Sequence, residues 1–434
     1  WICPMGTIID LIKPKCKVSL KSQSLSWLKI VKYLLFFILI ISALFGNQTL
    51  TILDPITILN RTISSSIFPA AQSSIYGIES FFYRFEFMWD LLDKIHTGLL
   101  YPIFHDIQTY STAAFPFLLI LVVIIGLNWW KQSFWCRYLC PLGGLLGLVS
   151  KFSIFRRKVT DSCTACKVCA HKCPTGTIDA EVGFLSDPSE CTFCFECIES
   201  CPYDANNFQW TIKDWHKPQK RDVDLKRREV LLSLGATIGL VALARIEPIN
   251  NHTPATLLRP PGAVRGIFES RCLRCTACIN ICPTQGLQPS LFEGGWSNVM
   301  TPILIPRLGY CEISCKACTE ICPSEAIPKL SLEEKQASKI GLASVNRNRC
   351  LPWAYATACI ICEEACPLPD KAIELEEDLI LNEQGEQVII QKPIVIKEKC
   401  IGCGVCEHQC PMGGEAAIRV FSQTELSFSS GNYW

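Results

Sequence analysis

Cysteine placement is the feature that most constrains how this chain can fold. The sequence holds 28 cysteines in 434 residues, and their tight clusters argue against a disulfide framework. Six stretches repeat one pattern: three cysteines lie in close succession, and a fourth comes after three more residues, directly before a proline. The six motifs are Cys163, Cys166, Cys169 and Cys173; Cys191, Cys194, Cys197 and Cys201; Cys272, Cys275, Cys278 and Cys282; Cys311, Cys315, Cys318 and Cys322; Cys350, Cys359, Cys362 and Cys366; and Cys400, Cys403, Cys406 and Cys410.

This spacing suits a cubane 4Fe-4S cluster. Thiolates at every third residue of a loop can reach three irons of one cluster, while the N–H groups of the loop point at its sulfides. In two-cluster ferredoxins the fourth iron takes its ligand from the Cys-Pro cysteine of a partner motif. Zinc is the alternative for a single copy, but zinc ribbons separate their two knuckles by many residues. The six copies therefore predict six 4Fe-4S clusters held by these cysteines.

The exchange of the fourth ligand predicts which motifs pair. A short segment separates the first two motifs, so one cluster is expected to use Cys163, Cys166, Cys169 and Cys201, and its neighbour Cys191, Cys194, Cys197 and Cys173. In the later block the two inner motifs have widened first gaps, whereas the outer two are regular. This difference favours nested pairing, first with fourth and second with third, over the alternative of sequential pairing.

Four cysteines remain outside the six motifs: Cys3, Cys16, Cys136 and Cys140. Cys136 and Cys140 form a CxxxCP motif, and Cys3-Pro resembles the end of a second one. We expect its first cysteine to precede Trp1, in an N-terminal piece that this sequence does not include. The motif predicts a redox pair or a metal site, with an inert structural pair as the alternative. Cys16, between two lysines, is expected to be a bystander.

Three apolar segments, 30–46, 113–130 and 230–246, predict transmembrane helices; buried helices of a soluble domain are the alternative. By the positive-inside rule, their lysine- and arginine-rich flanks place the two-cluster module in the cytoplasm and the four-cluster domain in the periplasm of a bacterial inner (cytoplasmic) membrane. Arg227 and Arg228 resemble a twin-arginine export signal. The aromatic and acidic stretch 80–90 predicts a helix in the membrane interface, with a quinol pocket as the alternative.

Composition and missing motifs narrow the function. The net charge of +1 carries no electrostatic signal for nucleic acid. The sequence has no CxxCH for covalent haem, no Walker A motif and no GxGxxG, and the three apolar segments contain no histidine for a haem pair. No catalytic residue is identified. We therefore expect an electron-transfer protein or an oxidoreductase subunit and not an independent enzyme.

The order of these parts resembles two known proteins joined together. Residues 1 to about 205, with CxxxCP, two spans, CxxxCP and two ferredoxin motifs, resemble the quinol-dehydrogenase membrane subunit of periplasmic nitrate reductase systems. The remainder, from Lys226-Arg-Arg-Glu to Ala417-Ile-Arg-Val, resembles the four-cluster ferredoxin encoded beside that subunit. The chain is thus similar to a fusion within the polyferredoxin family. The resemblance implies electron flow between the quinone pool and a periplasmic acceptor, but the joined halves leave the acceptor open.

The predicted fold class is α+β, with transmembrane helices and tandem bacterial-type two-cluster ferredoxin folds. The expected domains are a membrane domain at 1–160, a two-cluster module at 161–205, a linker at 206–229, a transmembrane or signal-anchor helix at 230–246, and a four-cluster domain at 247–434. We expect single electrons to pass between the quinone pool, or a membrane redox complex, and a partner oxidoreductase. A maturation factor that reduces the metal centre of another complex and a redox sensor are the alternatives. The direction of flow stays open, because 4Fe-4S potentials span roughly −700 to +450 mV.

Overall fold

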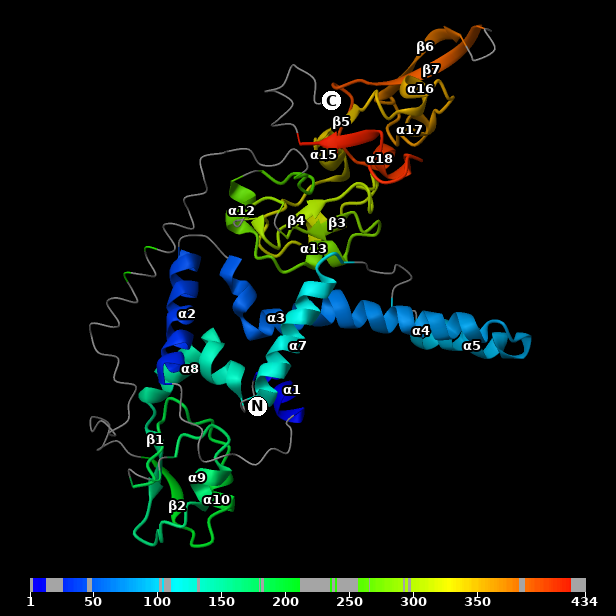
Figure 1. Cartoon of the computed structure of the whole chain (residues 1–434). Helices are drawn as coiled ribbons and strands as arrows, with labels where there is room; N and C mark the ends of the chain where they lie inside the picture. Colours follow the sequence, from blue (N-terminus) through cyan, green and yellow to red (C-terminus); the bar gives the residue numbers. More distant parts are fainter. Residues whose placement is uncertain are drawn as a thin grey trace. The chain divides into compact units, whose positions relative to one another are not determined.

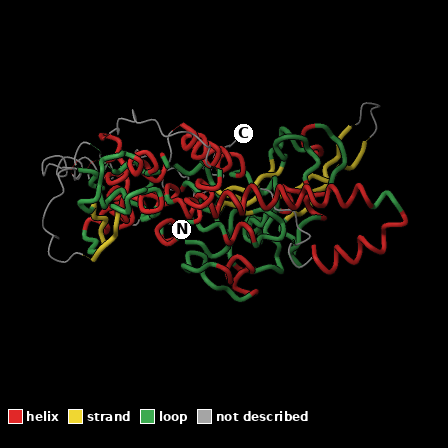
Figure 2. The backbone as a smooth tube through the Cα atoms, turned by 90° about the horizontal axis from the view of Figure 1, so that it is seen from below, coloured by secondary structure: helices red, strands yellow, loops and turns green. Residues whose placement is uncertain are grey.

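The computed structural model of the chain describes residues 3–12, 26–44, 49–100, 104, 111–130, 133–178, 180, 183–210, 235, 239, 257–264, 266–291, 293–295, 298–381 and 387–422. The chain divides into two compact units. Unit 1 comprises Trp1–Phe45, Leu50–Thr62 and Pro116–Ile246, and unit 2 comprises Gly46–Thr49, Ile63–Phe115 and Glu247–Trp434. Figure 1 labels helices and strands of both units, and Figure 2 distinguishes helices, strands and loops by colour.

Unit 1 begins with a helical part. Its elements are α1 (Pro4–Leu11), α2 (Ser26–Leu44), η1 (Thr49–Leu53), α3 (Pro55–Thr62), α7 (Ala114–Trp130), η5 (Trp135–Leu139) and α8 (Pro141–Lys151). Met5, Ile58, Ile124 and Trp135 from four of these elements share one core. Helix α8 packs closely on α2 because Gly144 has no side chain: a Cβ there would lie 2.9 Å from the carbonyl oxygen of Lys32.

The first two cysteine motifs form a small ferredoxin-like part of unit 1. Its elements are β1 (Phe155–Val159), α9 (Val168–Lys172), α10 (Glu196–Glu199) and β2 (Asn206–Trp210). Strands β1 and β2 pair antiparallel, with Phe155 opposite Trp210 and Val159 opposite Asn206. The first and the last strand of this part are thus hydrogen-bonded to each other, and both motifs lie between them in the sequence.

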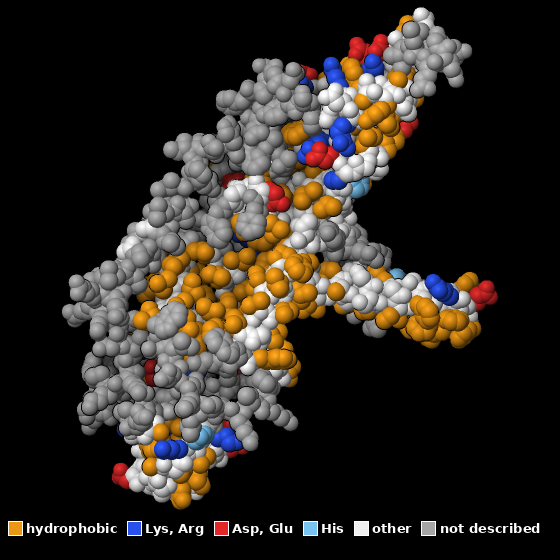
Figure 3. Space-filling view, in the orientation of Figure 1, with side chains coloured by type: hydrophobic (Ala, Val, Ile, Leu, Met, Phe, Trp, Pro, Cys, Tyr) orange, Lys and Arg blue, Asp and Glu red, His pale blue; other side chains and the backbone are white. Residues whose placement is uncertain are grey.

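Unit 2 contains a helical hairpin formed by η2 (Ile63–Ile67), α4 (Phe68–Phe82), η3 (Glu86–Met88), α5 (Trp89–Ile95) and η4 (His96–Leu100). His96 Nδ1 lies 2.8 Å from Glu79 Oε1 and joins the two sides. The stretch 80–90, predicted as one helix, is instead divided. It holds the end of α4, a turn with 3₁₀-type bonds such as Phe85 N–H to the carbonyl of Phe82, and the start of α5. Phe87 at this turn is 85% exposed. Hydrophobic side chains gather on the surface of the hairpin end (Figure 3).

The last four motifs form the rest of unit 2. The elements are α12 (Ile267–Arg271), α13 (Ala277–Asn280), β3 (Leu287–Pro289), β4 (Pro302–Leu304), α14 (Ala317–Ile321), α15 (Leu332–Ala337), β5 (Leu342–Val345), α16 (Leu351–Ala354), α17 (Ile361–Glu364), β6 (Ile373–Leu381), β7 (Gln387–Val395), α18 (Val405–Gln409) and β8 (Ile418–Phe421). Three antiparallel pairs form, β3 with β4, β5 with β8 and β6 with β7. One hydrophobic core runs through all four motifs, from Leu258 to Val420.

The transmembrane prediction is wrong for the described residues. Two predicted segments fall on α2 and α7, but no described helix is both long enough and apolar enough to cross a membrane. Helix α7 ends after 17 residues, a rise of about 26 Å against a hydrocarbon core of about 30 Å. Helix α2 carries Lys29 and Lys32, and Lys32 Nζ lies 2.7 Å from Glu190 Oε1.

Two further predictions depended on those helices. The fold class that included transmembrane helices is corrected to a mixed helix and strand fold with ferredoxin domains. The inner-membrane location, with its cytoplasmic and periplasmic sides, is contradicted by the same finding. The third segment, 230–246, lies outside the described residues except at positions 235 and 239, and Arg227 and Arg228 also lie outside them.

Candidate iron-sulfur sites

In unit 1 the structure brings the first two motifs together in the predicted exchange. One pocket is lined by four cysteines, here named the Cys163 group: Cys163, Cys166, Cys169 and Cys201. Cys173 lies beside the other motif, close enough for its charge to affect the thiols of Cys191 and Cys197. The Cys191 group consists of Cys191, Cys194, Cys197 and Cys173.

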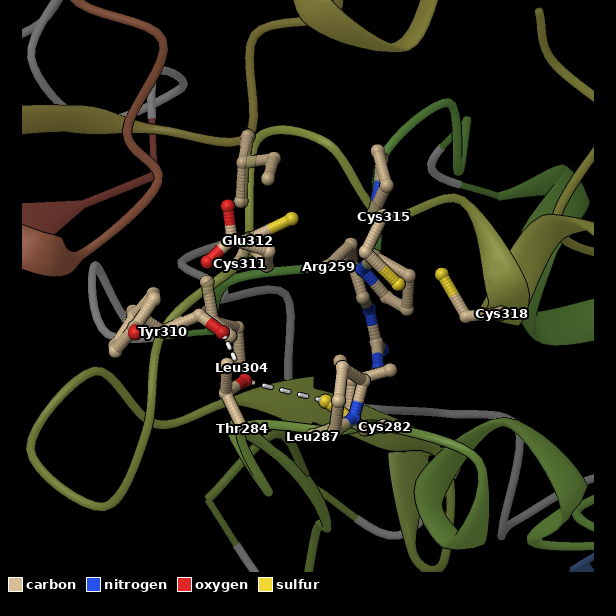
Figure 4. Close-up of a pocket in the computed structure, with 14 residues that line it drawn as sticks. Arg259, Cys282, Thr284, Leu287, Leu304, Tyr310, Cys311, Glu312, Cys315 and Cys318 are labelled. Carbon is tan, nitrogen blue, oxygen red and sulfur yellow. Dashed lines mark hydrogen bonds between the residues drawn. The ribbon is translucent and has the colours of Figure 1, made fainter. Parts of the chain in front are cut away.

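In unit 2 the four motifs pair in sequential order. The Cys311 group lines one pocket and consists of Cys311, Cys315, Cys318 and Cys282 (Figure 4). The Cys272 group consists of Cys272, Cys275, Cys278 and Cys322, of which Cys322 lies beside Cys278. The Cys350 group lines another pocket and consists of Cys350, Cys359, Cys362 and Cys410. The Cys400 group consists of Cys400, Cys403, Cys406 and Cys366, of which Cys366 lies beside Cys403.

The nested pairing predicted for this block is therefore wrong. The reason is the chain reversal within each pair of motifs. Strands β3 and β4 are antiparallel, so the segment after Cys282 returns to lie beside the segment before Cys311. The hairpin of β6 and β7 does the same between Cys366 and Cys400. Each reversal places a Cys-Pro cysteine beside the next motif along the chain.

The backbone of four motifs is shaped to receive an anion. In each, the residue before the second cysteine and the residue after it have a positive φ: Ala165 and Lys167, Phe193 and Phe195, Arg274 and Thr276, and Gly402 and Gly404. Left-handed residues that interrupt a right-handed backbone turn successive N–H groups toward one point and form an anion-binding nest. A non-glycine residue in this conformation costs roughly 1–2 kcal/mol, so its recurrence fits a loop that closes around a cluster.

Hydroxyl and N–H groups surround the Cys-Pro cysteines. The sulfur of Cys173 lies 3.5 Å from Thr175 Oγ1, that of Cys282 3.5 Å from Thr284 Oγ1, and that of Cys322 3.8 Å from Ser324 Oγ. The N–H of Ala205 donates to Cys201 Sγ at 3.3 Å, and that of Ala417 donates to Cys410 Sγ at 3.4 Å. Such bonds stabilise thiolates and tune a cluster. Sequence reasoning missed these residues, although Cys-Pro-Thr and Cys-Pro-Ser are visible signals.

Burial favours the protonated form of several other thiols. Burial, with the charges of neighbouring thiols, raises the pKa of Cys318 and of Cys362 to about 12. The pKa of Cys173 is lowered instead: burial raises it, but the bonds from Thr175 and Thr177 more than offset this effect. Because iron binds the thiolate, each group must release protons when it takes up a cluster. Four cysteines that line one pocket, with N–H and hydroxyl partners nearby, form a donor set that fits a 4Fe-4S cluster.

Buried cations lie beside several of the groups. Arg157 on β1 is buried, its Nη2 lies 3.7 Å from Cys169 Sγ, and it also bonds to Cys197, so one guanidinium serves both groups of unit 1. Lys335 on α15 is buried next to the Cys311 group and lowers the pKa of Cys311 against the larger, opposing effect of burial. No spacing rule in the sequence marks either residue.

The CxxxCP cysteines also meet in the structure. Cys3, Cys136 and Cys140 pack in the core of the helical part of unit 1. Cys3 precedes α1 and Cys140 precedes α8, and the N–H of Gly143 donates to Cys140 Sγ at 3.3 Å. Burial and the neighbouring thiols raise the pKa of Cys136 to about 12. Their role as a redox pair or metal site stays a prediction, and Cys16 lies outside the described residues.

Four sequence families match this chain. Residues 156–211 and 271–327 match two families described as 4Fe-4S dicluster domains. Residues 393–414 match a 4Fe-4S binding domain, and a further 4Fe-4S binding domain matches residues 1–21 and 112–160. The last match covers the CxxxCP cysteines.

Relatives of known name match just under half of the chain. The methylamine utilization ferredoxin-type protein MauM of Methylorubrum extorquens is 34% identical over 207 residues, which are 45% of this chain and 88% of that protein. MauM of Paracoccus denitrificans is 34% identical over 194 residues, 43% of this chain and 80% of that protein. The ferredoxin-type protein NapG of Escherichia coli is 31% identical over 210 residues, 47% of this chain and 86% of that protein.

The cysteine groups and the dicluster matches together define an iron-sulfur electron-transfer protein of the polyferredoxin class. Within that class, the chain belongs to the family of ferredoxin-type proteins that includes MauM and NapG. The predicted polyferredoxin family and the 4Fe-4S cofactor are confirmed at this level.

Proposed function

We propose that the chain binds six 4Fe-4S clusters with the 24 cysteines of its six groups and passes single electrons through them to a partner oxidoreductase. The observation that carries the proposal is the meeting, in every group, of three cysteines from one motif with the Cys-Pro cysteine of its partner. A bound cluster supplies one-electron redox chemistry. The residues of the chain hold it, shield it from water and adjust its potential.

The quinone pool is our proposed electron donor. It is supported by the likeness of residues 1 to about 205 to a quinol-dehydrogenase subunit, and not by a quinone site in the structure. A soluble quinol analogue should then reduce the clusters of the purified chain under anaerobic conditions. Absence of reduction by quinol, together with reduction by dithionite, would leave only a protein donor.

Iron and sulfide analysis tests the cluster proposal. About 24 irons and as many sulfides per chain are expected after anaerobic reconstitution, from four of each per cluster. Stoichiometric zinc, or fewer than four clusters, contradicts it.

The Cys201→Ala variant tests the ligand exchange. It should damage the cluster of the Cys163 group and leave that of the Cys191 group largely intact, because Cys201 belongs to the pocket of the first motif. EPR spectra of the reduced protein distinguish the two clusters. Loss of the Cys191-group cluster alone would refute the exchange, and Cys173→Ala, with the opposite expected result, is its matched control.

A further inference from the structure

Lys335 is a buried ammonium without a carboxylate partner in the part of the chain that the structure describes. Its side chain is 2% exposed, and its Nζ donates to the carbonyl oxygen of Glu312, the residue after Cys311. Helix α15 holds it there through a capping box, in which Glu334 N–H donates to Ser331 Oγ at 3.2 Å and Ser331 N–H donates to Glu334 Oε2 at 2.8 Å. Burying an ammonium is costly unless an anion lies nearby.

The Cys311 group supplies that anion. Lys335 reaches the Cys311 thiol as a hydrogen-bond donor, and its charge also acts on Cys318. Four thiolates around a cluster carry net negative charge, and reduction adds one more electron. A fixed cation at this place therefore favours the reduced state. Arg259, which lines the pocket itself, is already paired with Glu269 at 3.0 Å.

The neighbouring Cys400 group has different surroundings. The two groups touch: the N–H of Cys311 donates to the carbonyl oxygen of Cys403 at 2.8 Å. Around Cys403 and Cys406, the groups that act on the thiols are other cysteines and the buried carboxyl of Glu407, and Arg419 and Arg307 act in turn on that carboxyl. The contact therefore joins a group with an inner cation to a group that lies beside a buried carboxyl.

We propose that Lys335 holds the reduction potential of the cluster at the Cys311 group above that of the cluster at the Cys400 group, so that electrons cross the Cys311–Cys403 contact toward the Cys311 group. The inference rests on the proposed cluster binding. In the step, one electron leaves the reduced cluster at the Cys400 group, which becomes oxidised, and the cluster at the Cys311 group becomes reduced. No bond forms or breaks.

Redox titration of the full, cluster-loaded chain, followed by EPR, tests this. Lys335→Met keeps the apolar stem and removes the charge. At a fixed potential, Lys335→Met should lower the ratio of reduced to oxidised cluster at the Cys311 group about tenfold. This change corresponds to a reduction potential lower by about 59 mV for one electron. Lys335→Arg, which keeps the positive charge, should have a reduction potential close to that of the wild-type chain. The matched control is Lys316→Met, which removes a partly exposed lysine of the same motif that pairs with Glu320 at 2.9 Å and should shift the potential far less.

An unchanged or higher potential in Lys335→Met, or an equal shift in Lys316→Met, overturns the proposal. If Lys335→Met does not retain its clusters, the order of the two cluster potentials in the wild-type chain tests the proposal. Cys315→Ser and Cys403→Ser then identify, by the EPR signal that each alters, the clusters of the Cys311 and Cys400 groups. The first signal must titrate at the higher potential, and the reverse order overturns the proposal. Iron analysis of the same samples reports separately on cluster binding.

Discussion

Single residues decide how closely the cysteine loops approach one another. Gly309 is the clearest case: a Cβ at this position would lie 1.9 Å from the carbonyl oxygen of Thr284 and 2.6 Å from the nitrogen of Gly286. Thr284 also donates its hydroxyl to the carbonyl oxygen of Tyr310, the residue before Cys311 (Figure 4). The main chain of the loop after Cys282 is therefore in direct contact with the main chain of the loop before Cys311.

Gly309→Ala is therefore expected to separate Cys282 from the rest of the Cys311 group. Both neighbours of the new methyl group are main-chain atoms, so no side chain can move aside. We expect loss of the cluster at the Cys311 group, measured as about four irons fewer per chain. Gly413→Ala is the control, since nothing lies within 4 Å of a Cβ there. A full iron content in Gly309→Ala would show that this approach is not required.

At the scale of elements, ion pairing joins α2 to the loop that precedes Cys191. Lys32 Nζ lies 2.7 Å from Glu190 Oε1, with side chains 3% and 1% exposed, and Arg137 Nε of η5 lies 3.9 Å from Glu190 Oε2. A membrane-crossing reading of α2 treats Lys32 as a flank. The structure shows it as a buried contact between the helical part and the ferredoxin-like part of unit 1.

Glu190→Gln should destabilise unit 1 strongly, because it leaves the buried Lys32 ammonium without its counter-charge. Removing one partner of a buried pair costs about 3–5 kcal/mol. Thermal unfolding, followed by circular dichroism, measures the loss. Glu320→Gln breaks the exposed pair of Lys316 and Glu320, with side chains 42% and 59% exposed, and is expected to cost about 0–1 kcal/mol. Equal losses in the two variants would contradict the role of Glu190.

Across the whole molecule, the thiols of the cysteine groups should give the cluster-free and cluster-loaded chains opposite responses to pH. Burial, followed by neighbouring thiols, raises the pKa of Cys318 and Cys362 to about 12, and burial raises that of Cys350 and Cys403 to about 11. An unfolded cysteine has a pKa near 9. A pKa that is higher in the folded state stabilises the fold below pH 9, and this contribution is lost as the pH rises toward 11 to 12.

The cluster-free chain should accordingly unfold at lower urea concentration as the pH rises past 9, under reducing conditions. The loaded chain should instead lose its clusters as the pH falls, because protons compete with iron for the thiolates. Urea midpoints and visible absorption measure the two effects. A midpoint of the cluster-free chain that stays level or rises above pH 9 would contradict the first expectation, and clusters that are lost only at high pH would contradict the second.

The cysteine spacing determined by itself the class of cofactor, the candidate ligands and the exchange between the first two motifs. These features are local: three thiolates within a few residues can serve one cluster whatever surrounds them, and the segment between Cys173 and Cys191 is too short for another partner to intervene. Tertiary structure decided the rest. Strand reversals by β3 with β4 and by β6 with β7 set the sequential pairing of the later motifs, which the widened gaps at Cys311 and Cys350 had suggested wrongly.

The same division explains the failed membrane prediction and the missed cations. An apolar run reports only that a helix avoids water, and a count of apolar residues cannot show that Lys32 on α2 meets Glu190, more than 150 residues away. Lys335 and Arg157 likewise gain their roles from burial beside sulfurs that lie far from them in sequence or on another element. The spacing of the ligands depends on a few residues that are close in sequence. The charge around a cluster depends instead on which distant side chains the fold brings to it.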